Sequence, residues 1–270
     1  MNKILLPTDF SDNSANAIRY ALDLYAGTQA TFYVLNVQKA SGYATDDLLI
    51  ASPGTSVYEA IVSDNKEKLK NFFEPIEAEY SQHDYGFELI VDFDTLTDAI
   101  DQSVKQYEID LVVMGSNGAT GAAEVLFGSN TLKTIRALDH PLLIIPEGYK
   151  FQGIHDILFT LHQDEEMEED PTEILRRLRN RFDARLTLLE ILEEEPTRSS
   201  AEMEAQADRY FRLKGIPFAM SISAFVQLNP VDLNVLFAKK ELLLKRFFMG
   251  SEANRVSYGT MVPLLILHHA

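Results

Sequence analysis

The sequence predicts an α/β fold made of two similar domains, and two observations lead to this prediction. Short β-rich apolar runs alternate with stretches in which apolar residues recur at helical spacing. Segments of the first half also recur in the second half at nearly constant offsets. Alternating strands and helices favour right-handed βαβ crossovers, which place parallel strands in one sheet with helices on both of its faces.

The first half opens with a short apolar strand that ends at Pro7-Thr8-Asp9, and Ser11 then provides a good helix N-cap. Four more strands are predicted at residues 31–37, 87–91, 111–114 and 142–145. A helix-like stretch at 130–138 precedes the last of them. Apolar residues at helical spacing predict three earlier helices, and these residues are Ala15, Ile18, Leu22 and Tyr25, then Leu69, Phe72, Ile76 and Tyr80, then Leu96, Ile100, Val104 and Tyr107.

The internal repeat covers both ends of each half. Residues 4–9 align with 157–162 and residues 30–35 with 184–189, whereas residues 109–114, 128–130 and 141–145 align with segments 122 positions further on. The predicted domains are therefore residues 1–147 and 151–270, joined near Pro146 and Gly148. The second copy is about 30 residues shorter, and its third helix is expected to be truncated because only residues 223–230 are left between its third and fourth strands.

Composition excludes several classes of function. The chain has no cysteine, which rules out disulfides, thiolate metal sites and a cysteine nucleophile. A formal charge of −17 argues against nucleic acid as a partner. No apolar stretch approaches the ~18 residues of a membrane span, and Met1-Asn-Lys leads directly into a strand rather than a signal peptide. We therefore expect a soluble cytoplasmic protein.

A glycine motif follows the predicted strand at 111–114. It consists of Gly115-Ser-Asn-Gly118, nine further residues and Gly128-Ser129, and it leads into the helix at 130–138. Glycines allow a ligand to approach the backbone closely, and the unpaired N–H groups of a helix start attract anions. The motif therefore indicates a polyphosphate site, although a simple surface loop that closes a βα connection is the alternative.

Together with Asp9 at a strand end and with Leu35-Asn-Val37, this glycine spacing resembles the ATP-binding pattern of the universal stress protein family. The resemblance covers residues 1 to about 147 and implies an open five-stranded parallel sheet of order 3-2-1-4-5 in each domain. It also implies a ligand at the switch point between strands 1 and 4. The implied cofactor is ATP, with or without Mg²⁺, and the implied binding residues are Pro7, Thr8, Asp9, Val37, Met114, Gly115, Asn117, Gly118, Gly128, Ser129, Asn130 and Thr131.

Each part of this site has a chemical role. Asp9 could accept hydrogen bonds from adenine or ribose, and its alternative role is to cap the following helix. Val37 would present backbone groups to adenine, residues 115–118 would wrap the ribose and phosphates, and residues 128–131 would offer N–H and hydroxyl groups to the terminal phosphates. Asn117 stands where many relatives carry a histidine, so it keeps a hydrogen-bond donor but lacks a titratable group.

The second copy departs from this pattern where binding would occur. Phe237 replaces Gly115, Lys240 replaces Gly118 and His162 replaces Asp9, while Gly250-Ser251 is kept. We therefore expect this half not to bind nucleotide in the same way and to act as a built-in partner. The two copies should form an intramolecular pseudo-dimer through their last strands, residues 142–145 and 264–267, because both strands are apolar throughout and lie at the sheet edge in the resembling fold. Single-domain members of the family dimerise in this way, and a homodimer of the whole chain is the alternative assembly.

Other features have less specific interpretations. The acidic run 164–170 before Pro171 suggests a helix start more than a metal site, and His268-His269 is an incidental pair. Residues 42–56 form either a lid or an ordinary insertion. Five arginines around residues 176–185 face either an acidic partner, the acidic first domain or solvent, and a solvated helix face is favoured.

The sequence carries no signature of a familiar nucleotide enzyme. It has no P-loop and no dinucleotide-binding loop, and no Ser-His-Asp or paired-carboxylate arrangement stands out. The first hypothesis is therefore an ATP-binding stress or energy-state regulator. The alternatives are a scaffold that acts through protein contacts without nucleotide and a slow ATPase or phosphotransfer enzyme.

Overall fold

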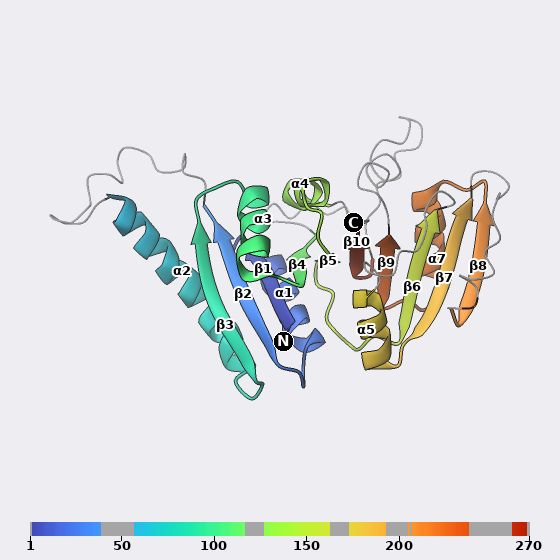
Figure 1. Cartoon of the computed structure of the whole chain (residues 1–270), viewed down its shortest axis with the longest axis horizontal. Coiled ribbons are helices and arrows are strands. Elements are labelled where there is room, and N and C mark those ends of the chain that lie inside the picture. Colours follow the sequence, from blue (N-terminus) through green and yellow to red (C-terminus); the bar gives the residue numbers. More distant parts are fainter. Residues whose placement is uncertain are drawn as a thin grey trace.

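The structure is a computed structural model that describes residues 2–38, 57–116, 127–162, 173–192, 205, 207–237 and 261–268. Its strands form a single ten-stranded sheet of order β3-β2-β1-β4-β5-β10-β9-β6-β7-β8 (Figure 1). The N-terminal half supplies the first five strands of that order and the C-terminal half supplies the other five.

The N-terminal half alternates strands and helices. Its elements are β1 (Asn2–Thr8), α1 (Asp12–Leu24), β2 (Ala30–Val37), α2 (Val57–Glu79), β3 (Tyr85–Asp92), α3 (Leu96–Tyr107), β4 (Leu111–Gly115), α4 (Ser129–Ala137) and β5 (Leu142–Ile145). Ser11 is the N-cap of α1, and its side chain accepts a hydrogen bond from the backbone of Ser14.

The described elements of the C-terminal half follow the same alternation. They are β6 (Asp156–His162), α5 (Glu173–Phe182), β7 (Arg185–Leu192), β8 (Arg209–Lys214), α7 (Phe218–Leu228), β9 (Leu233–Phe237) and β10 (Leu264–Leu267). All strand pairs within each half are parallel, and both halves have the order 3-2-1-4-5. The predicted fold class is confirmed.

The two halves meet at the strands β5 and β10. These strands pair antiparallel, with Leu143 opposite Leu265, so that the sheet continues without a break from one half to the other (Figure 1). Every residue of both strands is buried. This is the strand pair through which the sequence analysis expected the halves to meet, because each strand would otherwise leave an apolar edge unpaired.

Side chains of successive strand residues point to opposite faces of the sheet, and this alternation creates two core layers. In β1, Ile4 and Leu6 belong to one layer and Leu5 to the other. The first layer includes buried residues of α1, α2 and α5, and the second includes those of α3, α4 and α7. Both layers run across β5 and β10, so each half helps to bury the other.

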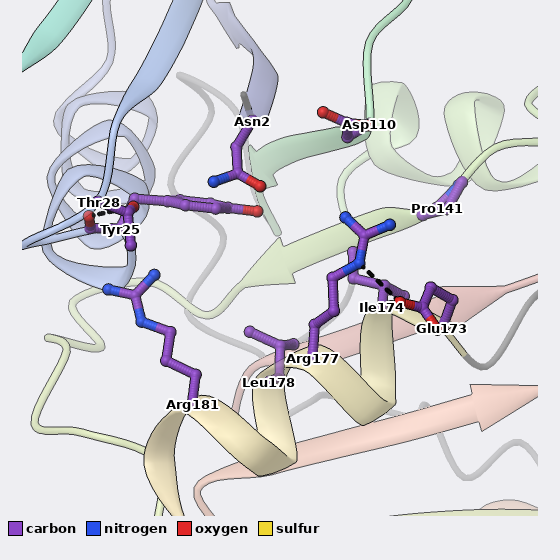
Figure 2. A pocket seen from close by; sticks show the side chains of 10 residues that line it. All are labelled: Asn2, Tyr25, Thr28, Asp110, Pro141, Glu173, Ile174, Arg177, Leu178 and Arg181. Carbon is purple, nitrogen blue, oxygen red and sulfur yellow. Dashed lines mark hydrogen bonds and ion pairs between the residues drawn. The ribbon is translucent and has the colours of Figure 1, made fainter.

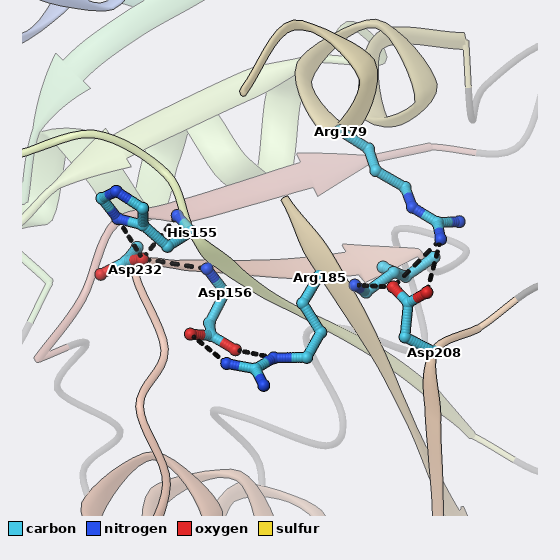
Figure 3. A network of polar contacts seen from close by, with 7 residues as sticks. His155, Asp156, Arg179, Arg185, Asp208 and Asp232 are labelled. Atoms are coloured by element: carbon cyan, nitrogen blue, oxygen red, sulfur yellow. Dashed lines mark hydrogen bonds and ion pairs between the residues drawn. The ribbon is translucent and has the colours of Figure 1, made fainter. Parts of the chain in front are cut away.

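The internal repeat appears in backbone contacts as well as in sequence. Asp110 precedes β4, and its Oδ2 accepts the backbone N–H of Lys3 at 2.8 Å. Asp232, which lies 122 positions later, precedes β9 and accepts the backbone N–H of Asp156 at 3.0 Å (Figure 3). Asp156 lies 153 positions after Lys3. In both halves, therefore, an equivalent aspartate before the fourth strand accepts a hydrogen bond from the backbone near the start of the first strand.

The expectation of a truncated third helix in the second copy is wrong. Helix α7 runs for 11 residues before β9, close to the 12 residues of α3, and β8 lies earlier than the sequence analysis assumed. Residues 216–226 form an apolar stretch whose periodicity does not separate a buried strand from a helix. The second copy is instead shortened between β7 and β8, where residues 193–208 take the place of residues 38–84 between β2 and β3.

Candidate functional site

The predicted site residues gather at one edge of the sheet. Strand β1 pairs in parallel with both β2 and β4, so the carboxyl ends of these three strands lie side by side. Thr8, Val37 and Gly115 are the last residues of β1, β2 and β4. This edge is the switch point of the strand order, where ligands of open α/β sheets bind.

Buried hydrogen bonds shape the end of β1. The carbonyl of Thr8 accepts a hydrogen bond from Asn36 Nδ2 at 2.8 Å, and the Thr8 hydroxyl lies 2.8 Å from the hydroxyl of Ser14. The same hydroxyl accepts the backbone N–H of Phe10 at 3.1 Å, and Phe10 has a left-handed backbone with φ of 64°. Bulky residues rarely adopt that conformation, so these bonds hold a sharp turn between β1 and α1.

Asp9 lies on this turn and is exposed. Its Oδ1 accepts hydrogen bonds from both the backbone N–H and the hydroxyl of Ser11, at 3.1 Å and 2.5 Å. Asp9 therefore orders the start of α1, which is the capping alternative from the sequence, while its carboxylate stays at the surface beside the switch point. The geometry is compatible with a ligand role as well.

Gly115 ends β4 in close contact with α1. A Cβ atom at this position would lie 2.6 Å from Nδ2 and 2.9 Å from Cγ of Asn13, closer than real contacts allow. A larger residue here would force the side chain of Asn13 to move, so glycine suits the packing of β4 against the first turn of α1 whether or not a ligand binds. The sequence motif alone did not distinguish this packing role from a phosphate-binding role.

The start of α4 is tied directly to the end of β4. The N–H of Gly128 donates to the carbonyl of Ser116 at 2.7 Å, and the buried Thr131 hydroxyl contacts the carbonyls of Gly115 and Ser116 at 3.1 Å and 2.9 Å. Gly128 is the N-cap residue and makes no side-chain cap, while Ser129 and Asn130 are exposed. An uncapped helix start is suited to an anion, and Thr131 would contribute its backbone N–H, since its hydroxyl is already engaged.

Several predicted residues lie outside the part of the chain that the structure describes. These are Asn117 and Gly118 of the glycine motif, Lys240 and Gly250 in the second copy, the acidic run 164–170 and the segment 42–56. Pro7 and Met114, in contrast, are buried one position before the ends of β1 and β4. Because both residues are buried, they would contribute to a ligand site through their backbones.

The corresponding edge of the C-terminal half has different chemistry. His162 ends β6, where Asp9 follows β1 in the first half, and it is 3% exposed with its ring 6.0 Å from that of Phe218. Phe237 ends β9 at the position of Gly115. A buried imidazole therefore replaces an exposed carboxylate, and the sequence has phenylalanine where the first half has glycine.

Two buried asparagines were missed by sequence reasoning. Asn36 fixes the Thr8 carbonyl from the neighbouring strand, and Asn13 faces Gly115 from α1. Asparagine is depleted in strands, so its presence within the apolar run before Val37 was the available signal for Asn36. Asn13 carried no such signal, because a polar residue in the first turn of a helix is ordinary.

Arg181 contacts the N-terminal half, which is the alternative that the sequence analysis named beside a solvated helix face. Its Nη2 donates to the backbone carbonyl of Ala26 in the N-terminal half at 2.7 Å, and its guanidinium lies 5.7 Å from the centre of the Tyr25 ring. The buried side of α5 is as predicted, with Leu175 and Leu178 in the core and Ile174 and Phe182 packed against it.

Within the described residues, no helix has the length and apolar character needed to cross a membrane. The same residues contain no cluster of three or more His, Asp or Glu side chains placed to hold a metal ion.

Comparison with known proteins relates the chain to one family. The model described as the universal stress protein family matches residues 1–146. Universal stress protein MJ0577 of Methanocaldococcus jannaschii is 28% identical over 153 residues, which are 53% of this chain and 93% of that protein. Universal stress protein YxiE of Bacillus subtilis is 28% identical over 146 residues, which are 53% of this chain and 98% of that protein.

A similar fold extends over the whole chain. A universal stress protein from Archaeoglobus fulgidus has a crystal structure that superposes on this chain with a TM-score of 0.68. The match covers 100% of this chain and 99% of that one, and the two sequences are 16% identical. At this identity the likeness concerns the fold alone. The family model covers more than half of the chain, and the chain therefore belongs to the universal stress protein family.

Proposed function

We propose that the N-terminal half binds ATP at the carboxyl edge of β1, β2 and β4, and that the protein serves as a stress-response or energy-state regulator. One observation carries the proposal: the uncapped N-terminus of α4 is hydrogen-bonded through Gly128 to Ser116, at the switch point of the sheet. The glycine spacing that resembles the family's ATP-binding pattern ends at this helix start.

The residues present fit the chemistry of a nucleotide. Backbone N–H groups at Ser129, Asn130 and Thr131 would receive the terminal phosphates, and Asp9 would accept hydrogen bonds from the ribose or base. Asn117 and Gly118 complete the proposed set on the basis of the sequence motif. Because the chain carries a net charge of −17, a Mg²⁺ ion brought by the nucleotide would reduce the repulsion between ligand and protein.

In this proposal the C-terminal half is a partner rather than a second nucleotide site. Residues 1–147 would form the binding domain and residues 151–270 the degenerate one, with β5 and β10 as their intramolecular pseudo-dimer interface. The antiparallel pairing of these strands supports that assignment, as do His162 and Phe237 at the strand ends. The cytoplasm predicted from the sequence remains the proposed location, and the homodimer remains an untested alternative assembly.

Titration calorimetry with ATP and magnesium tests the proposal directly. We expect a stoichiometry near one per chain, because only the N-terminal half combines Asp9 with the complete glycine motif. A stoichiometry near two would show that the second half also binds. Absence of heat, together with absence of nucleotide in the dialysed protein, would favour the scaffold alternative.

Any hydrolysis of bound ATP should be slow. The proposed phosphate site contains Ser129, Asn130 and Thr131 but no lysine or evident general base to stabilise the transition state more than bound ATP. Single-turnover measurements should therefore give rates far below the ~1–100 s⁻¹ of kinases. A rate in that range that is lost in Gly128→Val would contradict the prediction of slow hydrolysis and would show that the protein is an enzyme.

A further inference from the structure

A pocket of about 460 Å³ lies between the two halves, at the end of the sheet where β1, β4 and β5 begin and therefore opposite the candidate site (Figure 2). Asn2 begins β1 and borders it, as do Asp110 directly before β4 and Pro141 directly before β5. Tyr25 at the end of α1 and side chains of α5 close it. Pockets for small molecules commonly measure about 300–1,000 Å³, so this volume suits a compact ligand.

The pocket combines an apolar wall with charged groups. Ile174, Leu178 and the ring of Tyr25 form the apolar part. Arg177 is compensated by Glu173, whose Oε1 accepts from Arg177 Nε at 3.0 Å. Figure 2 shows Arg181 reaching from α5 toward the side of Tyr25, away from that pair.

Arg181 differs from the neighbouring arginines in the kind of group that its guanidinium contacts. Arg176 and Arg177 pair with Glu173, Arg179 with Asp208 and Arg185 with Asp156. In the described part of the chain, the partners of Arg181 are instead the Ala26 carbonyl and the rings of Tyr25 and Phe182. Burial lowers the pKa of its guanidinium, and a partly buried cation without a carboxylate gains from an anionic partner.

The internal repeat identifies a second place in the molecule whose surrounding residues correspond to those that line the pocket. Asp232 corresponds to Asp110 at the offset of 122, and at the offset of 154 Ile174 corresponds to Tyr20. There, two aromatic residues of the linker, defined here as the segment between β5 and β6, contact Tyr20. The ring centres of Tyr149 and Phe151 lie 6.3 Å and 5.2 Å from that of Tyr20.

The two linker rings also lie near other residues that correspond to pocket-lining ones. Phe151 also contacts Phe182, the counterpart of Thr28, with ring centres 5.7 Å apart. Burial raises the pKa of the Tyr149 phenol and the charge of Asp232 raises it further, so this phenol lies within the field of that carboxylate. The chain has one linker, and the linker fills one of the two equivalent positions.

We propose that the pocket between α1 and α5 binds a small aromatic carboxylic acid with a hydrogen-bond donor on its ring. The ring would occupy the place that the linker rings take in the other half, against Ile174 and Leu178. The carboxylate would pair with Arg181, and the donor on the ring would hydrogen-bond to the carboxylate of Asp110, which lines the same pocket. Because Asp110 and Glu173 also line the pocket, a doubly charged phosphate would meet repulsion that a monocarboxylate avoids.

Calorimetric titration of the full chain with 4-hydroxyphenylacetate tests this proposal. We expect saturable binding at one site per chain, with inorganic phosphate and the amine analogue tyramine binding at least ~10-fold more weakly. No binding of 4-hydroxyphenylacetate, or equal binding of phosphate or tyramine, would overturn the proposal.

Two variants and one control locate the site. Arg181→Gln removes the charge and should weaken binding at least ~10-fold, whereas Arg209→Gln on the exposed strand β8 removes one charge elsewhere and should leave binding unchanged. Thr28→Phe introduces the aromatic ring found at the equivalent position and should abolish binding by filling the pocket, with Arg181 intact. Unchanged affinity in either Arg181→Gln or Thr28→Phe would overturn the assignment, and circular dichroism establishes that each variant is folded.

Discussion

Replacing Gly128 with valine is expected to weaken ATP binding by at least ~100-fold, or about 2.8 kcal/mol, while the protein stays folded. Gly128 has φ of −59° and ψ of 158°, an extended conformation that valine adopts without strain. The branched side chain would, however, project at the start of α4, where the proposed phosphates approach the N–H groups. The loss should therefore come from steric exclusion and not from unfolding.

Gly115 is less suitable for this experiment, although it belongs to the same motif. A Cβ atom there would overlap the side chain of Asn13, so a substitution would disturb the contact between β4 and α1. Gly250→Val provides the matched control, since this glycine aligns with Gly128 in the degenerate half. Calorimetry should show unchanged ATP affinity for Gly250→Val, and equal losses in the two variants would contradict the assignment of the site to the N-terminal half.

Replacing Leu265 with alanine is expected to destabilise both halves together by about 2–5 kcal/mol. Leu265 lies at the centre of β10, has no exposed surface and pairs with Leu143 of β5. It belongs to the core layer that also contains Ile4 of the N-terminal half and Phe159 of the C-terminal half. Removal of its side chain leaves a cavity at the junction, where neither half can close around the gap alone.

Differential scanning calorimetry can measure this coupling. The parent chain should unfold in a single transition, and Leu265→Ala should move that whole transition down by roughly 2–4 °C for each kcal/mol lost. Leu228→Ala is a control, because this leucine is 83% exposed and its loss should have little effect. Two separate transitions, with only the C-terminal one shifted by Leu265→Ala, would show that the halves fold independently.

Much of the fold was predictable because its determinants are local. The apolar spacing of Ile18, Leu22 and Tyr25 predicts α1, and Ser11 caps it because its hydroxyl reaches the N–H of Ser14 only three residues away. The two matched sets of strands also predicted one topology for both halves. The resemblance to the family supplied the strand order, which local patterns do not contain.

The candidate site was predictable to a smaller extent. The sequence placed the end of β1 at residues 7–9, the end of β4 at residue 114 and the start of α4 at residue 130, because glycine spacing and strand boundaries are local patterns. In the structure β1 ends at Thr8, β4 at Gly115, and α4 begins at Ser129. The reason for a glycine at position 115 became visible only with Asn13 opposite it, and the engaged hydroxyl of Thr131 depends on carbonyls 15 and 16 residues away. Such contacts depend on how separate segments pack against one another, and the periodicity of a sequence does not show which segments pack together.

The shorter half shows the same division between local pattern and long-range packing. The charged strand β8 was missed because Arg209, Arg212 and Lys214 interrupt its apolar pattern. It lies at the outer edge of the sheet, where little apolar surface is needed. The sequence analysis assigned Arg181 to a solvated face because helical spacing shows only which side of α5 packs on its own sheet. It does not show that the N-terminal half contacts the other side. The sequence thus specified the elements and their buried faces, whereas the pairing of β5 with β10 brought α5 against α1 and thereby created the pocket between them.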